Sequence, residues 1–186
     1  MIRSELNTGP RRGLGRRNLN REHSPLLAAI VLYGSIILAS WLPTYAVAIS
    51  MPIMPPFGYL MLVCWRLMRP GTLAPWAALP LGAFDDLVSG QPFGSAILLW
   101  SLTLLVFEWF ESRFPWRGFL QDWLTSAIAC GSYVILAAVV SGAHLNWPLL
   151  LAIFPQLLLS MALYPIIAAM VATLDRFRLM RIKEIR

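Results

Sequence analysis

Two adjacent aspartates, Asp85 and Asp86, are the side chains whose type and spacing are best suited to chemistry in this sequence. They lie in LGAFDDLVSGQPFG, residues 81–94, and are the only charged residues between positions 70 and 107. Aspartate-rich motifs can hold Mg²⁺ and a diphosphate, but that chemistry needs several carboxylates around the metal. Ser89 stands where a DDxxD motif has its third aspartate, and the apolar segments hold no second acidic cluster. We therefore expect neither a metal site nor a cofactor.

The composition indicates an integral membrane protein. Hydrophobic residues make up 58% of the 186 residues and charged residues only 13%, whereas a soluble domain has about 45–50% and about 25%. The net charge is +6, and basic blocks at the chain ends could bind nucleic acid. Beside apolar segments, however, such blocks usually set topology and contact anionic lipid. We expect membrane lipid as a partner, and no nucleic acid.

Six apolar runs follow one another along the chain. They cover residues 25–49, 57–67, 73–89, 93–107, 124–141 and 147–173. A transmembrane helix needs about 20 residues, so the second run is short; it could begin as early as Met51 or include irregular backbone buried against other helices. The predicted organisation is a disordered basic cytoplasmic tail (1–24), a six-span membrane domain (25–174) and a second basic cytoplasmic tail (175–186).

The positions of the basic residues support six spans. The 15 Lys and Arg residues divide as six before Ser24, two in the second loop (Arg66 and Arg69), two in the fourth loop (Arg113 and Arg117) and five after Leu174. The first, third and fifth loops have none. All basic residues therefore lie on one side, as the positive-inside rule requires. We predict an all-α membrane protein of the bacterial inner membrane with both termini in the cytoplasm.

This topology also argues against an enzyme. An intramembrane serine protease needs a nucleophile near a histidine, but His23 and His144 are predicted on opposite sides of the membrane. His144 is expected to be a solvated loop residue. Cys64 and Cys130 are isolated in apolar surroundings and are expected to be small core residues. We therefore predict no enzymatic activity.

The aspartates belong to a strip of small residues. Gly82, Asp86, Gly90 and Gly94 are spaced by four, a spacing that lets two helices approach closely. We expect a helical hairpin near the periplasmic face, with Asp85 pointing about 100° away from the strip, toward the loop or the headgroups. For Asp86 three roles stay open: hydrogen bonding to the turn and capping a helix, contact with a partner helix, or catalysis and ligand binding.

This strip resembles the signature of the rod shape-determining protein MreD family. The pattern is a glycine, an aspartate four residues on, a glycine four further and a glycine that opens the next helix; Gly82, Asp86, Gly90 and Gly94 match it. The length, the six apolar runs, the short second run and the basic ends fit as well. The resemblance covers roughly residues 25–175.

The resemblance implies a non-enzymatic inner-membrane scaffold of the bacterial cell-elongation machinery. Its expected partners are an MreC-like protein and, with it, a RodA-type glycosyltransferase, a class B penicillin-binding protein and the MreB cytoskeleton. The fold that the resemblance implies is similar to that of the S-components of energy-coupling factor transporters. The alternative function is therefore an S-component-like protein that binds a small solute in a cavity toward the periplasmic side.

An aromatic and charged segment, residues 108–123, separates the fourth and fifth runs. Its composition is typical of the membrane interface. Lying in the headgroup layer is one interpretation, and contact with a cytoplasmic partner is the other. The candidate contact residues are Trp109, Phe114, Trp116 and Arg117.

Overall fold

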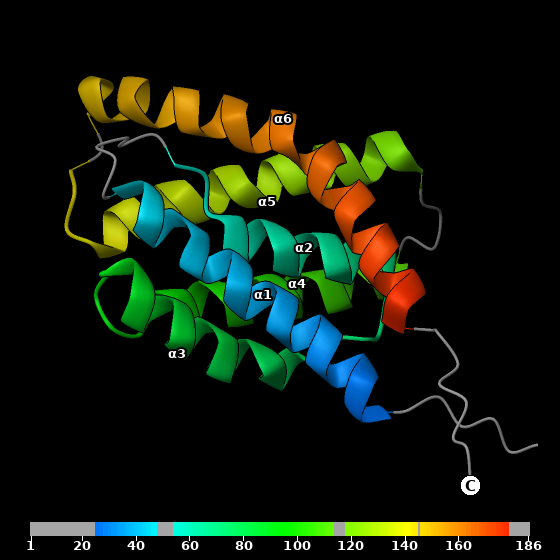
Figure 1. The fold of residues 1–186 in the computed structure, drawn as a ribbon. Coiled ribbons are helices and arrows are strands. Elements are labelled where there is room, and N and C mark those ends of the chain that lie inside the picture. The colour runs from blue at the N-terminus through cyan, green and yellow to red at the C-terminus, as the bar shows by residue number, and fades with distance from the viewer. Residues whose placement is uncertain (1–24, 48–53, 114–117, 145, 179–186) are drawn as a thin grey trace, which may run out of the picture.

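The computed structural model describes residues 25–47, 54–113, 118–144 and 146–178, and these residues are helical without any strand. The α-helices are α1 (Pro25–Val47), α2 (Phe57–Met68), α3 (Ala78–Ser89), α4 (Ser95–Arg113), α5 (Phe119–Val140) and α6 (Trp147–Arg178), and the 3₁₀-helix η1 (Pro75–Ala77) precedes α3. Successive α-helices run in alternating directions, so their termini gather at two ends of the bundle (Figure 1). The predicted tail 1–24 and residues 179–186 lie outside the described residues.

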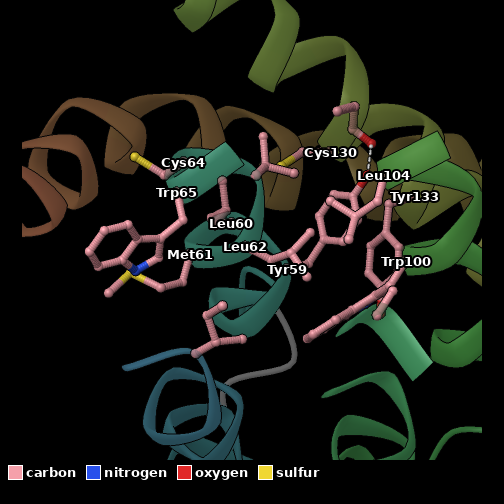
Figure 2. Packing of buried hydrophobic residues seen from close by; sticks show 14 of the residues in the cluster. Tyr59, Leu60, Met61, Leu62, Cys64, Trp65, Trp100, Leu104, Cys130 and Tyr133 are labelled. Carbon is pink, nitrogen blue, oxygen red and sulfur yellow. Dashed lines mark hydrogen bonds between the residues drawn. The ribbon is translucent and has the colours of Figure 1, made fainter. Parts of the chain in front are cut away.

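Helix α2 is the centre of the bundle. Every residue from Gly58 to Leu67 is buried, and α2 packs against α1, α4, α5 and α6. Figure 2 shows its side chains in one cluster with Trp100 of α4 and Tyr133 of α5. A helix that is apolar on all sides is buried on all sides. The second apolar run therefore needs no polar face, because protein surrounds it.

The lengths of the helices bear on how the chain meets a membrane. Among the described residues, three segments are long and apolar enough to cross one by length and composition: Leu26–Thr44, Phe119–Val140 and Trp147–Arg178. Helices α2 and α3 have 12 residues each, or about 18 Å at about 1.5 Å per residue, less than the roughly 30 Å of a bilayer core. The described residues are all-α, and the three long apolar helices are consistent with a membrane protein. Each predicted run contains an α-helix.

Ion pairs join three helices at one end of the bundle. The Arg66 guanidinium is buried; it donates to the Leu73 carbonyl (2.9 Å) and pairs with Glu111 of α4 (3.0 Å). Arg69, just after α2, pairs with Asp175 of α6 (2.6 Å). Arg66 and Asp175 are buried, and charges that are taken out of water need such partners. These pairs therefore fix the C-terminal ends of α2, α4 and α6 side by side.

Helices α4, α5 and α6 extend beyond the expected apolar runs. Glu108–Arg113 continue α4 and residues 119–123 begin α5, so the described parts of the segment 108–123 are helical. The ion pair of Glu111 with Arg66 gives the last turn of α4 a partner inside the protein. Helix α6 likewise extends to Arg178, beyond the predicted domain boundary at 174, and the pairing of Asp175 ties this turn to α2.

Candidate functional site

The carboxylate of Asp86 lies at the start of α4 and accepts several hydrogen bonds there. Its Oδ2 accepts from the Gly94 N–H (2.8 Å), and its Oδ1 accepts from the Ala96 N–H (2.8 Å) and the Ser95 hydroxyl (3.0 Å). A longer contact comes from the Ile97 N–H (3.4 Å). An ionised carboxylate can only accept hydrogen bonds, so it matches a site that offers only donors.

These contacts complete the hydrogen bonding at the N-terminus of α4. The Gly94 carbonyl accepts from the Leu98 N–H (3.0 Å), which makes Gly94 the N-cap residue. The first four N–H groups of a helix have no partner inside the helix. Here the Ser95 N–H donates to the Pro92 carbonyl (3.0 Å), and Asp86 accepts from the other three. A side chain of α3 therefore caps α4, and its negative charge also suits the positive end of the helix dipole.

Gly82 lets the two helices of the hairpin come close enough for this cap. A Cβ atom at position 82 would lie 2.7 Å from both Cα and N of Ile97 and 2.9 Å from the Ala96 carbonyl carbon. These are backbone atoms, which cannot move aside as the end of a side chain can. Only glycine fits this position at the observed separation of α3 and α4.

The other two glycines shape the turn between the helices. Gly90 ends α3 with φ +69° and ψ +14°, the left-handed conformation that commonly closes a helix. Gly94 has φ +100°. Both values are costly for residues with a Cβ atom. The glycines thus reverse the chain within a few residues and bring Asp86 to the first turn of α4.

The structure brings all four residues of the strip together in the α3–α4 hairpin. Of the three roles left open for Asp86, hydrogen bonding to the turn and capping a helix describes its geometry. The side chain is buried, with 4% of its surface exposed, and both oxygens face α4. Its carboxylate is therefore occupied within the hairpin.

Asp85 differs from the expectation that it points to the loop or the headgroups. It is 8% exposed and lies beside Ser40 of α1, facing the side of α3 where Tyr133 of α5 also lies. Because neighbouring residues of a helix are about 100° apart, Asp85 turns away from α4 into a space between helices. The sequence alone could not show that α1 and α5 enclose this side.

That space is a cavity of about 530 Å³ at the end of the bundle where the α3–α4 turn lies. Its walls come from α1, α2, α3, α5 and α6, whose termini meet at the left in Figure 1. Its polar groups are those of Ser40, Thr44, Asp85, Ser89, Gln91, Tyr133, Ser141 and Gln156. The rest of the wall is mostly apolar, and no Lys or Arg of the described residues lines it.

The wall is held in place by contacts to the core. The Tyr133 ring stacks on Tyr59 with centroids 4.1 Å apart, and the Tyr59 hydroxyl hydrogen-bonds to Thr103 (2.9 Å) and to the Ala129 carbonyl (3.2 Å). On another part of the wall the Gln156 amide donates to the Met54 carbonyl (2.8 Å). The cavity is thus bounded by side chains with defined positions. Sequence reasoning missed Tyr133 and Gln156; the only signal was a polar group inside each apolar run.

The aromatic candidates at the other end are only partly described. Trp109 lies on α4 with 62% of its surface exposed, and the Arg113 guanidinium lies 5.9 Å from its ring centroid. Phe114, Trp116 and Arg117 lie outside the described residues. Within the described part of the chain no group of three or more His, Cys, Asp or Glu side chains is placed to hold a metal ion.

Comparisons with protein families, with curated proteins and with solved structures find no match to this chain.

Proposed function

We propose that this protein is a non-enzymatic scaffold of the bacterial cell-elongation machinery, spanning the inner membrane six times with both termini in the cytoplasm. The proposal rests on the resemblance of the glycine–aspartate strip to the MreD family signature. The observation that supports it most is that each residue of the strip has its own task in the hairpin: Gly82 in close packing, Asp86 in capping, Gly90 and Gly94 in the turn. Three structural tasks met by the four residues are hard to explain by a chance match of spacing.

The placement of charge supports the proposed orientation. The described arginines lie at the C-terminal ends of α2, α4 and α6, which the ion pairs of Arg66 and Arg69 hold together. The α3–α4 turn and the cavity lie at the other end of the bundle, where the described residues include no Lys or Arg. By the positive-inside rule the arginine end is cytoplasmic and the cavity end periplasmic.

A co-purification experiment tests the scaffold. The tagged protein is isolated in mild detergent from its native membrane, and the proteins recovered with it are identified by mass spectrometry. Recovery of an MreC-like coiled-coil protein, with or without a RodA-type synthase, is the expected result. The same experiment with Asp86→Asn, normalised to the amount of tagged protein, should recover less of the partner, while Asp85→Asn should recover the normal amount. Recovery of no wall-synthesis protein would refute the scaffold.

One observation favours the second candidate, a solute-binding protein like an S-component. The cavity at the end opposite the arginines has the size and the mixed polar and apolar wall of a small-molecule site. In the co-purification experiment this candidate predicts transporter ATPases and a coupling subunit with long helices in place of an MreC-like protein.

A further inference from the structure

We propose that the cavity beside the α3–α4 hairpin binds a small molecule that carries a cationic amine on an apolar body, with Asp85 as the acceptor of the amine. This inference deepens the second candidate function and rests on it, because it names the chemical class of the solute. It goes beyond the scaffold, for which no ligand is required.

The dimensions of the cavity match a small molecule. Ligand sites of proteins usually enclose about 300–1,000 Å³, and this cavity has about 530 Å³. Five helices contribute to its wall, so the space is a partly open pocket at the end of the bundle and not a groove along one helix. A pocket of this size suits a compact solute better than a long segment of a partner chain.

The charge of the wall selects the class of ligand. Asp85 is the acidic residue of the wall and is almost fully buried, and no basic residue of the described chain faces it there. Asp86, its neighbour, is occupied by the N-terminus of α4. A buried carboxylate without a cation is costly, and a ligand amine would supply the missing partner through a charge-assisted hydrogen bond. An anionic ligand would meet the same carboxylate with no positive group to offset it.

The rest of the wall defines the ligand further. Ser40 lies next to Asp85, and Gln91 lies beside the Tyr133 hydroxyl, so further hydrogen-bonding groups surround the proposed amine position. Away from these groups the wall is formed by apolar residues such as Phe57 and Ile153. A ligand with one polar, positively charged end and one apolar end satisfies both parts.

Binding of matched probes to the purified full-length protein tests the inference. The protein is placed in phosphatidylcholine nanodiscs, which have no net lipid charge, and titrated by calorimetry with 2-phenylethylammonium, 2-phenylethanol and 3-phenylpropionate, with empty nanodiscs as blank. We expect saturable binding of the amine, at least about tenfold tighter than that of the alcohol, since the alcohol can donate to the carboxylate but lacks the positive charge that completes an ion pair, and no binding of the acid.

Three variants locate the site. Asp85→Asn should weaken binding of the amine at least about tenfold, whereas Glu108→Gln, which removes an exposed acid of α4 outside the cavity wall, should leave it unchanged. Val88→Phe should abolish binding of the amine and the alcohol alike, because Val88 lines the cavity and is only partly buried. If Asp85→Asn fails to fold, the Val88 variant and the probe series still show whether the cavity binds the amine.

Two results would overturn the inference: no saturable binding of the amine, or equal binding of the amine and the acid. Neither result depends on partner proteins. Recovery of transporter subunits without amine binding would leave the solute-binding function standing with a ligand of another class. Amine binding without recovery of transporter subunits would support the amine site and refute the proposed role in a transporter.

Discussion

Replacement of Asp86 by asparagine tests the capping role of this residue, and comparison with the same replacement at Asp85 separates that role from the effect of removing a buried charge. In the native protein Oδ2 accepts from Gly94 N–H at 2.8 Å, and Oδ1 accepts from Ala96 N–H and the Ser95 hydroxyl. Asparagine can keep one oxygen toward Ala96, but its NH₂ group then faces the Gly94 N–H, so two donors oppose each other. Asp85→Asn is the matched control, because it removes the adjacent charge without touching α4.

The expected loss follows from the hydrogen bonds. A hydrogen bond to a charged group contributes about 1.5–3 kcal/mol, and loss of a helix cap costs about 1 kcal/mol. We therefore expect Asp86→Asn to lower the free energy of unfolding by about 2–4 kcal/mol, or roughly 4–15 °C in unfolding temperature for a chain of this length. Asp85→Asn should change it by less than about 1 kcal/mol, because no helix end depends on Asp85 and a buried charge is removed.

The two cysteines provide the assay. Cys64 and Cys130 are the chain's two cysteines and both are buried, so a thiol-reactive fluorophore labels them only as the bundle opens on heating. Unfolding of membrane proteins in detergent is often irreversible, so the variants are compared at one heating rate. Hydrogen exchange gives a local reading, and the amides of Gly94 and Ala96 should exchange faster in Asp86→Asn. If Asp86→Asn unfolds at the native temperature, or if Asp85→Asn is the less stable of the two, the capping argument is refuted.

Further predictions use the same unfolding assay. Gly82→Ala should lower the unfolding temperature, because its Cβ would meet the backbone of α4 at 2.7 Å and overpacking costs about 1–3 kcal/mol; Gly34→Ala, with open space around its Cβ, should not lower it, and equal effects would contradict the close approach. Gly90→Ala should cost about 1–2 kcal/mol because φ is +69°, and Gly90→Asn less, since asparagine tolerates this conformation; the reverse order would refute the turn geometry. Arg66→Ala should cost about 3–5 kcal/mol because its ion pair is buried, whereas Arg69→Ala should cost less, because Arg69 is half exposed and the buried Asp175 keeps Arg178 within 4.0 Å; similar losses would contradict this difference.

The helices themselves could be predicted from the sequence, and their environments could not. The apolar runs end at prolines, glycines and charges, and each run contains a helix within a few residues of the expected bounds. An apolar run has the same composition whether lipid or protein surrounds it, so the central position of α2 was not evident from the sequence. The ion pair of Glu111 was not evident for a related reason, because its partner Arg66 lies 45 residues earlier in the chain.

The hairpin was predictable because its requirements are local. Close packing, a left-handed turn and a capping carboxylate all act within residues 82–97, so the residue types carry the signal. The cavity was not predictable, because its wall is assembled from five helices that are distant in the sequence. Gln156 and Tyr133 look like isolated polar residues until α5 and α6 are seen to line the same cavity as α3.

The position of two aspartates inside an apolar segment follows from the geometry of a helix. Adjacent residues point about 100° apart, so one carboxylate can enter the hairpin while the other faces the space between α1 and α5. Asp86 meets N–H groups of the protein itself, which offset the cost of its burial. Asp85 has Ser40 beside it, but it has no helix N-terminus and no cation among the residues that line the cavity. This asymmetry is the reason to look for a cationic ligand at Asp85 and not at Asp86.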